Sequence, residues 1–97
     1  MKAYELMVIL DPSLEEEARA QTLDKIRGLV AANAGTVDSA DEWGKRRLAF
    51  EVAGKTDGEY FVFQIHAPAD SVAEVDRVLH ITDQVIRYMI VRREDLD

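Results

Sequence analysis

The strongest constraint on the fold is the order in which the spacing of apolar residues changes along the chain. A spacing of two residues predicts a β-strand, and a spacing of three to four predicts an amphipathic helix. The spacing of two occurs in four segments, which are 2–10, 36–52, 59–67 and 85–92. The helical spacing occurs in two segments, which are about 14–33 and 72–79. The expected order is therefore strand, helix, strand, strand, helix, strand.

Short polar segments mark the ends of these elements. Asp11-Pro12-Ser13 ends the first strand, and Ser13 with Glu16 forms an S-x-x-E capping box for the first helix. Asn33-Ala34-Gly35 tolerates left-handed backbone and ends that helix. Gly44 predicts a bend or bulge in the second strand, where we expect Trp43 to anchor the chain. The segment 54–58 predicts a hairpin loop before the third strand.

Two split βαβ units with right-handed crossovers account for this order. They predict an α+β, ferredoxin-like βαββαβ domain over residues 1–97, with a four-stranded antiparallel sheet and two helices on one face. The helix-covered face is expected to hold the even-numbered apolar residues of the first strand. It is also expected to hold Leu48, Phe50, Phe61, Phe63, Ile65, Tyr88 and Ile90. The other face is expected to combine apolar with cationic residues, namely Met7, Ile9, Tyr60, Val62, Met89 and Val91 with Lys45, Arg47 and Arg87. Such a mixed face is typical of a docking surface.

The cations are concentrated locally in a chain that is acidic overall. The net charge of −7 disfavours a general nucleic-acid binder, which would normally be basic. Lys45, Arg46 and Arg47 nevertheless stand together between Trp43 and Phe50. A basic cluster at the rim of a strand indicates contact with phosphates, and a solvated charged face is the alternative interpretation. Any RNA site is therefore expected to be local and shared with a more basic partner.

Several classes of site are disfavoured by the residues present. The chain has no cysteine, so disulfides and thiolate metal sites are impossible. His66 and His80 have no second ligand at metal spacing, and we expect neither a metal nor another cofactor. Glu5 and Asp11 interrupt the first apolar run, which disfavours a signal segment or a membrane span. We therefore expect a cytoplasmic protein.

The motif G-x-[basic]-[basic]-L-A-[aromatic], from Gly44 to Phe50, resembles the signature of bacterial small-subunit ribosomal protein six. Segments 4–12, 58–61 and 85–91 are similar to that family's first strand and turn, third strand and fourth strand, so the resemblance covers essentially the whole chain. Phe50 stands where the family usually has tyrosine, which keeps the ring and removes a hydroxyl.

The resemblance implies a structural protein of the small ribosomal subunit, without enzymatic activity or a small-molecule substrate. It implies binding to the central domain of 16S ribosomal RNA and a heterodimer with small-subunit ribosomal protein eighteen, a basic protein. Candidate RNA- or partner-binding residues are Lys2, Lys45, Arg46, Arg47, Tyr60, Arg87, Arg92 and Arg93.

Two other classes of protein share this topology. An acylphosphatase-like enzyme needs a cation and an oxyanion cradle between the first strand and the first helix, but that loop here is the acidic Asp11-Pro12-Ser13-Leu14. A regulatory or dimerisation domain without RNA binding is the second alternative. In a homodimer face, the basic cluster would repel its own copy unless acidic residues of the partner covered it.

Overall fold

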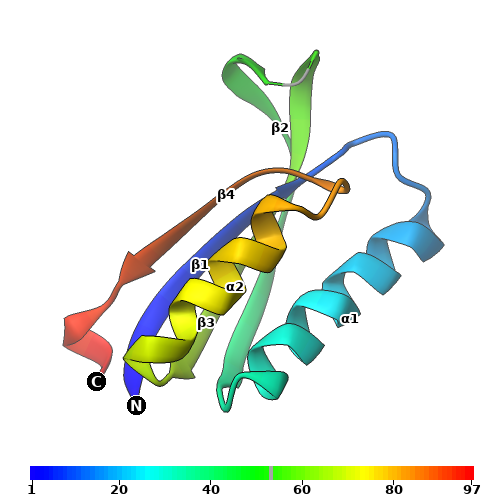
Figure 1. Ribbon diagram of the computed structural model, residues 1–97. Helices are drawn as coiled ribbons and strands as arrows, with labels where there is room; N and C mark the ends of the chain where they lie inside the picture. Colours follow the sequence, from blue (N-terminus) through cyan, green and yellow to red (C-terminus); the bar gives the residue numbers. More distant parts are fainter. Residues whose placement is uncertain (53) are drawn as a thin grey trace.

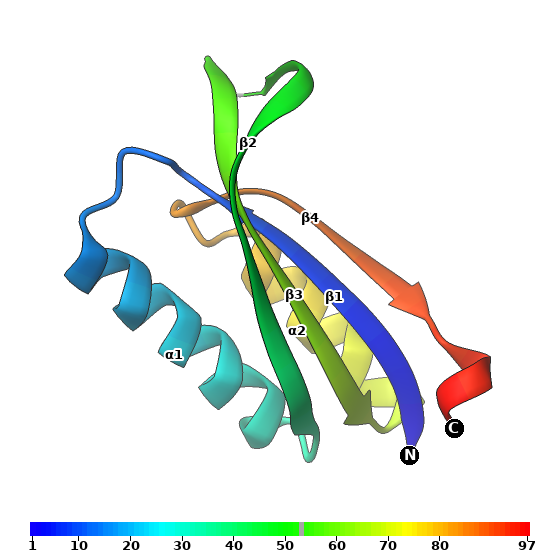
Figure 2. The same ribbon diagram turned by 180° about the vertical axis from the view of Figure 1, so that it is seen from behind.

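Four strands form one antiparallel sheet in the order β2-β3-β1-β4 in a computed structural model that describes residues 1–52 and 54–97. The strands are β1 (Lys2–Leu10), β2 (Thr36–Val52), β3 (Lys55–Ala67) and β4 (Val85–Arg92). Helices α1 (Glu16–Ala32) and α2 (Val72–His80) cover the same face of the sheet (Figures 1 and 2). Single 3₁₀ turns lie at η1 (Ala69–Ser71) and η2 (Glu94–Leu96). The expected ferredoxin-like order and topology are confirmed.

The core lies between the sheet and the two helices. Leu6, Val8 and Leu10 of the central strand β1 are completely buried there. The helices contribute four buried residues, which are Ile26, Val30, Val75 and Leu79, and β3 contributes Phe61, Phe63 and Ile65. Fully burying one such aliphatic or aromatic side chain stabilises the fold by about 1.5–3 kcal/mol. Tyr88 and Ile90 also pack against this cluster, as expected for that face of β4.

The placement of Leu48 and Phe50 in this core was wrong. β1 ends at Leu10, which lies opposite Glu59, so residues 55–58 of β3 pair with β2 alone. The two strands continue beyond the rest of the sheet as a two-stranded projection, at the top of Figure 1. We call this projection, residues 43–52 and 54–58, the hairpin arm. Since no helix covers it, Phe50 is 65% exposed.

The start of α1 also differs from the expected capping box. The side-chain hydroxyl and the backbone N–H of Ser13 both donate to Asp11 Oδ1, at 2.7 and 2.9 Å. Asp11 therefore closes a local turn with the residue two positions ahead, which removes Ser13 from the helix. The helix begins at Glu16 after Glu15, without a side-chain hydrogen bond at the cap. Glu16 and Glu17 still lie in the first turn, where the helix dipole favours acids.

The end of α1 is a Schellman motif whose left-handed residue is an alanine. Gly35 N–H donates to Val30 O at 2.9 Å, and Ala34 N–H donates to Ala31 O at 3.2 Å. Ala34 takes the left-handed conformation, with φ of 62°. The following Gly35 is needed for a different reason, because a side chain there would collide with its neighbours. A Cβ at Gly35 would lie 2.9 Å from His66 O, on the neighbouring β3.

The turn of the hairpin arm is shorter than expected, because β3 begins at Lys55 and pairs with Val52. Gly54, with φ of 78°, lies in this turn. Gly58 lies within β3 and is needed for a close approach, because a Cβ there would be 2.2 Å from Ile9 Cγ2. The glycine therefore lets the base of the hairpin arm lie close to β1.

Candidate nucleic-acid interface

A bulge in β2 positions the basic cluster at the base of the hairpin arm. The register with β3 shifts between Glu42 and Gly44, and Gly44 takes φ of 80°, as the sequence predicted for this glycine. Beyond the bulge, Lys45, Arg46 and Arg47 pair with Glu59, Gly58 and Asp57. All three basic side chains are exposed.

In the part of the chain that the structure describes, none of the ion pairs involves the three cations Lys45, Arg46 and Arg47. Glu59, which lies opposite Lys45, instead pairs with Arg19 at 4.0 Å. The hairpin arm therefore presents three cations that form no ion pair, with Asp57 opposite Arg47 as the nearest acid in the register, although the protein is acidic overall.

Trp43 forms a platform for Arg46. The guanidinium carbon of Arg46 lies 5.1 Å from the centroid of the indole, and Arg46 Nε donates to Trp43 O at 3.5 Å. Trp43 is 44% exposed and lies at the bulge, between Glu42 and Gly44. Its contact with Arg46 leaves both side chains accessible at the surface.

Arg87 brings β4 to the same end of the sheet. One row across the sheet runs from Gly44 through Tyr60 and Ile9 to Arg87, so Arg87 lies three strands, or about 14 Å, from the bulge. Its guanidinium carbon lies 5.7 Å from the ring centroid of Phe50, which belongs to the hairpin arm. Tyr60 is half-buried in this row. The exposed ring of Phe50 thus belongs to this surface, although its alternation with Leu48 had placed it in the core. The one signal in the sequence for this role was the presence of an aromatic residue on each side of the basic cluster.

The remaining candidates lie at the opposite end of the sheet, and two of them, Arg92 and Arg93, are engaged within the molecule. Arg92 donates to Ala3 O at 3.0 Å and forms a bidentate pair with Asp97. Arg93 pairs with Asp95 at 3.0 Å and with Glu5 at 3.3 Å. Lys2 is exposed at the start of β1. The structure therefore separates the eight candidates into five at the hairpin-arm end, Lys45, Arg46, Arg47, Tyr60 and Arg87, and three at the other end, Lys2, Arg92 and Arg93.

The chain end forms a clamp around the start of β1. The Asp97 carboxylate accepts hydrogen bonds from Arg92 and from the backbone N–H of Ala3, and these bonds lower the pKa of Asp97 to about 2. His66 contacts the Asp38 carboxylate through Nδ1 and Leu96 O through Nε2, the latter at 3.2 Å. Because both partners accept hydrogen bonds, the imidazolium satisfies both at once, and the bond to Asp38 raises the pKa of His66.

The sheet face opposite the helices is partly apolar. Met89 and Val91 are 47% and 39% exposed, and Met7 and Tyr60 are half-buried beside them. Ile9 and Val62 share this face by register but are buried by their neighbours. We call this surface the open face, and it has the mixed character expected of a docking surface.

Over residues 1–52 and 54–97, no three potential metal ligands gather into a site. None of the helices described is long and apolar enough to cross a membrane.

Comparisons with known proteins agree over nearly the whole chain. The family model described as "Ribosomal protein S6" matches residues 3–92. The small ribosomal subunit protein bS6 of Alkaliphilus oremlandii is 49% identical over 94 residues, which cover 97% of this chain and 99% of that protein. The protein of the same name from Nocardioides sp. is 46% identical over 92 residues, covering 95% and 96% of the two chains.

Solved structures give the same result. The crystal structure of 30S ribosomal protein S6 from Thermotoga maritima superposes with a TM-score of 0.92 at 26% identity, covering 98% of this chain and 90% of that one. The C-terminal domain of the MgtC protein from Mycobacterium tuberculosis has a TM-score of 0.59 at 15% identity and covers 100% and 93% of the two chains, a likeness of fold alone.

Proposed function

The chain belongs to the ribosomal protein S6 family, and from this membership we propose that it binds the central domain of 16S ribosomal RNA together with small-subunit ribosomal protein eighteen. As a member of this family it is a structural component of the small subunit of the cytoplasmic bacterial ribosome, and it is not an enzyme. The observation that carries the RNA proposal is the cluster of three exposed cations, Lys45, Arg46 and Arg47, which form no ion pair among the described residues.

The chemistry of the hairpin arm suits an RNA backbone. Arginine guanidinium groups donate paired hydrogen bonds to phosphate oxygens, and neutralising phosphates releases condensed counterions. The exposed rings of Trp43 and Phe50 flank the cations and offer faces on which unpaired bases can stack. Arg87 extends the cationic surface across the sheet to β4.

The open face and the overall charge support a shared RNA site with a basic protein. A chain with a net charge of −7 repels RNA except at the hairpin arm, and a basic partner would reverse that field nearby. The open face presents Met89 and Val91 to such a partner, and these apolar side chains would be buried on association. We therefore assign RNA contact to the hairpin arm and contact with protein eighteen to the open face.

A binding titration tests both parts of this proposal. A fragment of the 16S central domain is titrated with the protein, with and without protein eighteen, at several salt concentrations. We expect tight binding only with the partner present, and an affinity that falls as salt rises. In the double variant Arg46→Ala/Arg47→Ala, loss of two phosphate contacts should reduce the slope of log K against log salt by about 1.4–1.8.

A matched control removes the same charge elsewhere. The double variant Lys25→Ala/Arg77→Ala changes two exposed cations of α1 and α2, on the helix-covered side, and should bind with the parent slope. An unchanged slope for the hairpin-arm variant would contradict the proposed RNA contact, and unfolding of that variant would show that the arginines are structural. A homodimer that binds neither RNA nor protein eighteen would favour the dimerisation alternative.

A further inference from the structure

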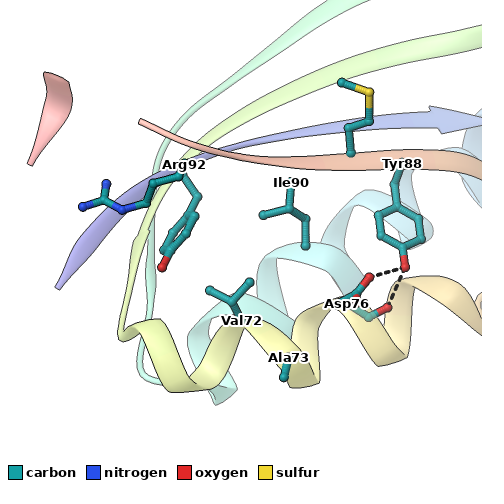
Figure 3. A pocket seen from close by; sticks show the side chains of 8 residues that line it. Val72, Ala73, Asp76, Tyr88, Ile90 and Arg92 are labelled. Atoms are coloured by element: carbon teal, nitrogen blue, oxygen red, sulfur yellow. Dashed lines mark hydrogen bonds between the residues drawn. The ribbon is translucent and has the colours of Figure 1, made fainter. Parts of the chain in front are cut away.

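A groove of about 360 Å³ lies between α2 and β4, on the helix-covered side of the sheet (Figure 3). This volume is in the range of sites that hold small molecules or peptide side chains. Val72, Ala73 and Asp76 line it from the helix, and the side chains of Tyr88 and Ile90 point toward them from the strand (Figure 3). Tyr4, Met89 and Arg92 complete the lining.

The strand above the groove is an unprotected sheet edge. β4 is the last strand in the sheet order, and no strand in the described ranges pairs with its outer side. Its sequence, V-I-R-Y-M-I-V-R, contains no proline, and both of its arginines make contacts within the molecule, Arg87 with the Phe50 ring and Arg92 with Asp97. The opposite edge, β2, carries Asp38, Asp41 and Glu42 along its length. The two edges therefore differ, and β4, with fewer charged residues, suits pairing with another chain better than β2 does.

The backbone of β4 offers hydrogen bonds directly beside the groove. The N–H of Arg93, just beyond the strand, donates to Ala3 O of β1 at 2.9 Å. Backbone groups in an antiparallel ladder alternate between the two sides, so those of Val91 and Met89 also turn toward β1. The N–H and C=O groups of Tyr88 and Ile90 consequently turn outward, and the side chains of these two residues face the groove.

The groove keeps one uncompensated negative charge. Arg92 at one end is neutralised by Asp97. Asp76 at the other end accepts a hydrogen bond from the Tyr88 hydroxyl, but forms no ion pair with any described residue. The nearby Arg77 is engaged by Glu74. A ligand that fits this groove should therefore bring apolar side chains and one cation.

We propose that the outer edge of β4 and this groove bind an extended segment of a partner protein, which adds a fifth strand to the sheet. Apolar side chains of the segment lie over Val72 and Ile90, and a lysine or arginine lies beside Asp76. The groove is on the helix-covered side of the sheet, opposite the open face, and Met89 is the one residue that belongs to both. It is therefore a second protein-binding surface, beyond the function proposed above.

Nuclear magnetic resonance of the full chain with a defined peptide tests the inference. The probe is a blocked peptide, Thr-Val-Thr-Val-Thr-Lys-Thr, in which valine and lysine share one face of a strand. We expect shift changes at Val72, Ala73 and Asp76, slower amide exchange at Tyr88 and Ile90, and half-saturation below about 1 mM. A peptide with glutamate in place of lysine should bind several-fold more weakly, and one methylated on alternate backbone nitrogens should not bind.

Protein variants give matched controls for the same titration. Ala73→Arg fills the groove and should abolish peptide binding, whereas Ala20→Arg makes the same change on an exposed position of α1 and should leave it unchanged. Asp76→Asn keeps the acceptor for Tyr88 and should weaken only the lysine peptide, by about 3-fold.

Four results would overturn the inference. They are absence of binding at 1 mM, equal binding of the glutamate or methylated peptide, shift changes confined to the open face, and a dimer of the protein formed through its own β4 edges. The urea midpoints of the variants show that each one is folded, so a loss of binding by Ala73→Arg reports on the groove.

Discussion

The close approach of Gly58 to Ile9 makes a sharp prediction about stability. A methyl group at Gly58 would lie 2.2 Å from Ile9 Cγ2, far inside van der Waals contact. Ile9 is β-branched and 6% exposed in the central strand, so its methyl cannot easily turn away. We expect Gly58→Ala to reduce the free energy of unfolding by about 1–3 kcal/mol, the usual cost of overpacking.

Urea denaturation measures this change directly. With a urea dependence of about 1–3 kcal/mol per molar, the midpoint should fall by roughly 1 M. Gly28→Ala is the matched control, because a Cβ at Gly28 meets nothing within 4 Å in the middle of α1. That substitution should raise the free energy of unfolding by about 0.5–1 kcal/mol, since alanine favours a helix over glycine.

A double-mutant cycle with Ile9→Ala identifies the contact. The single variant Ile9→Ala, which removes Cγ1, Cγ2 and Cδ1, should cost about 2–5 kcal/mol, because it leaves a cavity. In that background Gly58→Ala should become neutral or stabilising by about 0.4–1 kcal/mol, since alanine reduces the entropy of the unfolded chain. An equal cost in both backgrounds would refute the role of Ile9, and a stabilising Gly58→Ala in the parent would refute the close approach itself.

Three further predictions concern the end of α1 and the clamp at the chain end. Ala34→Gly should raise the free energy of unfolding by about 1 kcal/mol, because it relieves the left-handed backbone; a lower urea midpoint would contradict this. Because the pKa of His66 is raised, its bond to Asp38 stabilises the fold below pH 6.5, and this stability is lost as pH rises through the folded-state pKa. The urea midpoint of the parent protein should therefore exceed that of His66→Gln only at the lower pH values. Because the pKa of Asp97 is lowered to about 2, its contribution is present above pH 3.8 and is lost as pH falls toward 2; Asp97→Asn should lose this acid dependence, and an unchanged acid profile would contradict the clamp.

Periodicity was sufficient to predict the order of elements and most of the core. Alternation in β1 placed Leu6, Val8 and Leu10 correctly, because one face of a strand must be buried against the helices. The same alternation failed for Leu48 and Phe50. A local pattern shows which residues share a face, but it does not show how far a strand continues beyond its neighbours. The length of the hairpin arm depends on where β1 ends against β3, which the alternation in β2 does not indicate.

The candidate site could be predicted only in part. The cluster Lys45-Arg46-Arg47 is contiguous in sequence, so its place on one strand was predictable. The pairing of Arg92 with Asp97 and of Arg93 with Glu5 depends on how the chain end folds back over β1, which no local pattern indicates. The start of α1 was not predictable for a similar reason. The Ser13 hydroxyl donates to Asp11 and therefore does not cap the helix.

The central position of β1 sets the order in which this protein can assemble during its own synthesis. β1 leaves the ribosome first, but its partners are distant in the chain: Glu5 contacts Gln64 across 59 positions, and Ala3 contacts Arg92 across 89. The first strand therefore waits, with its apolar residues unpaired, until nearly all of the chain has been made. Contacts this distant in sequence make folding slow. Nascent chains should consequently become protease-resistant only after β4 has emerged.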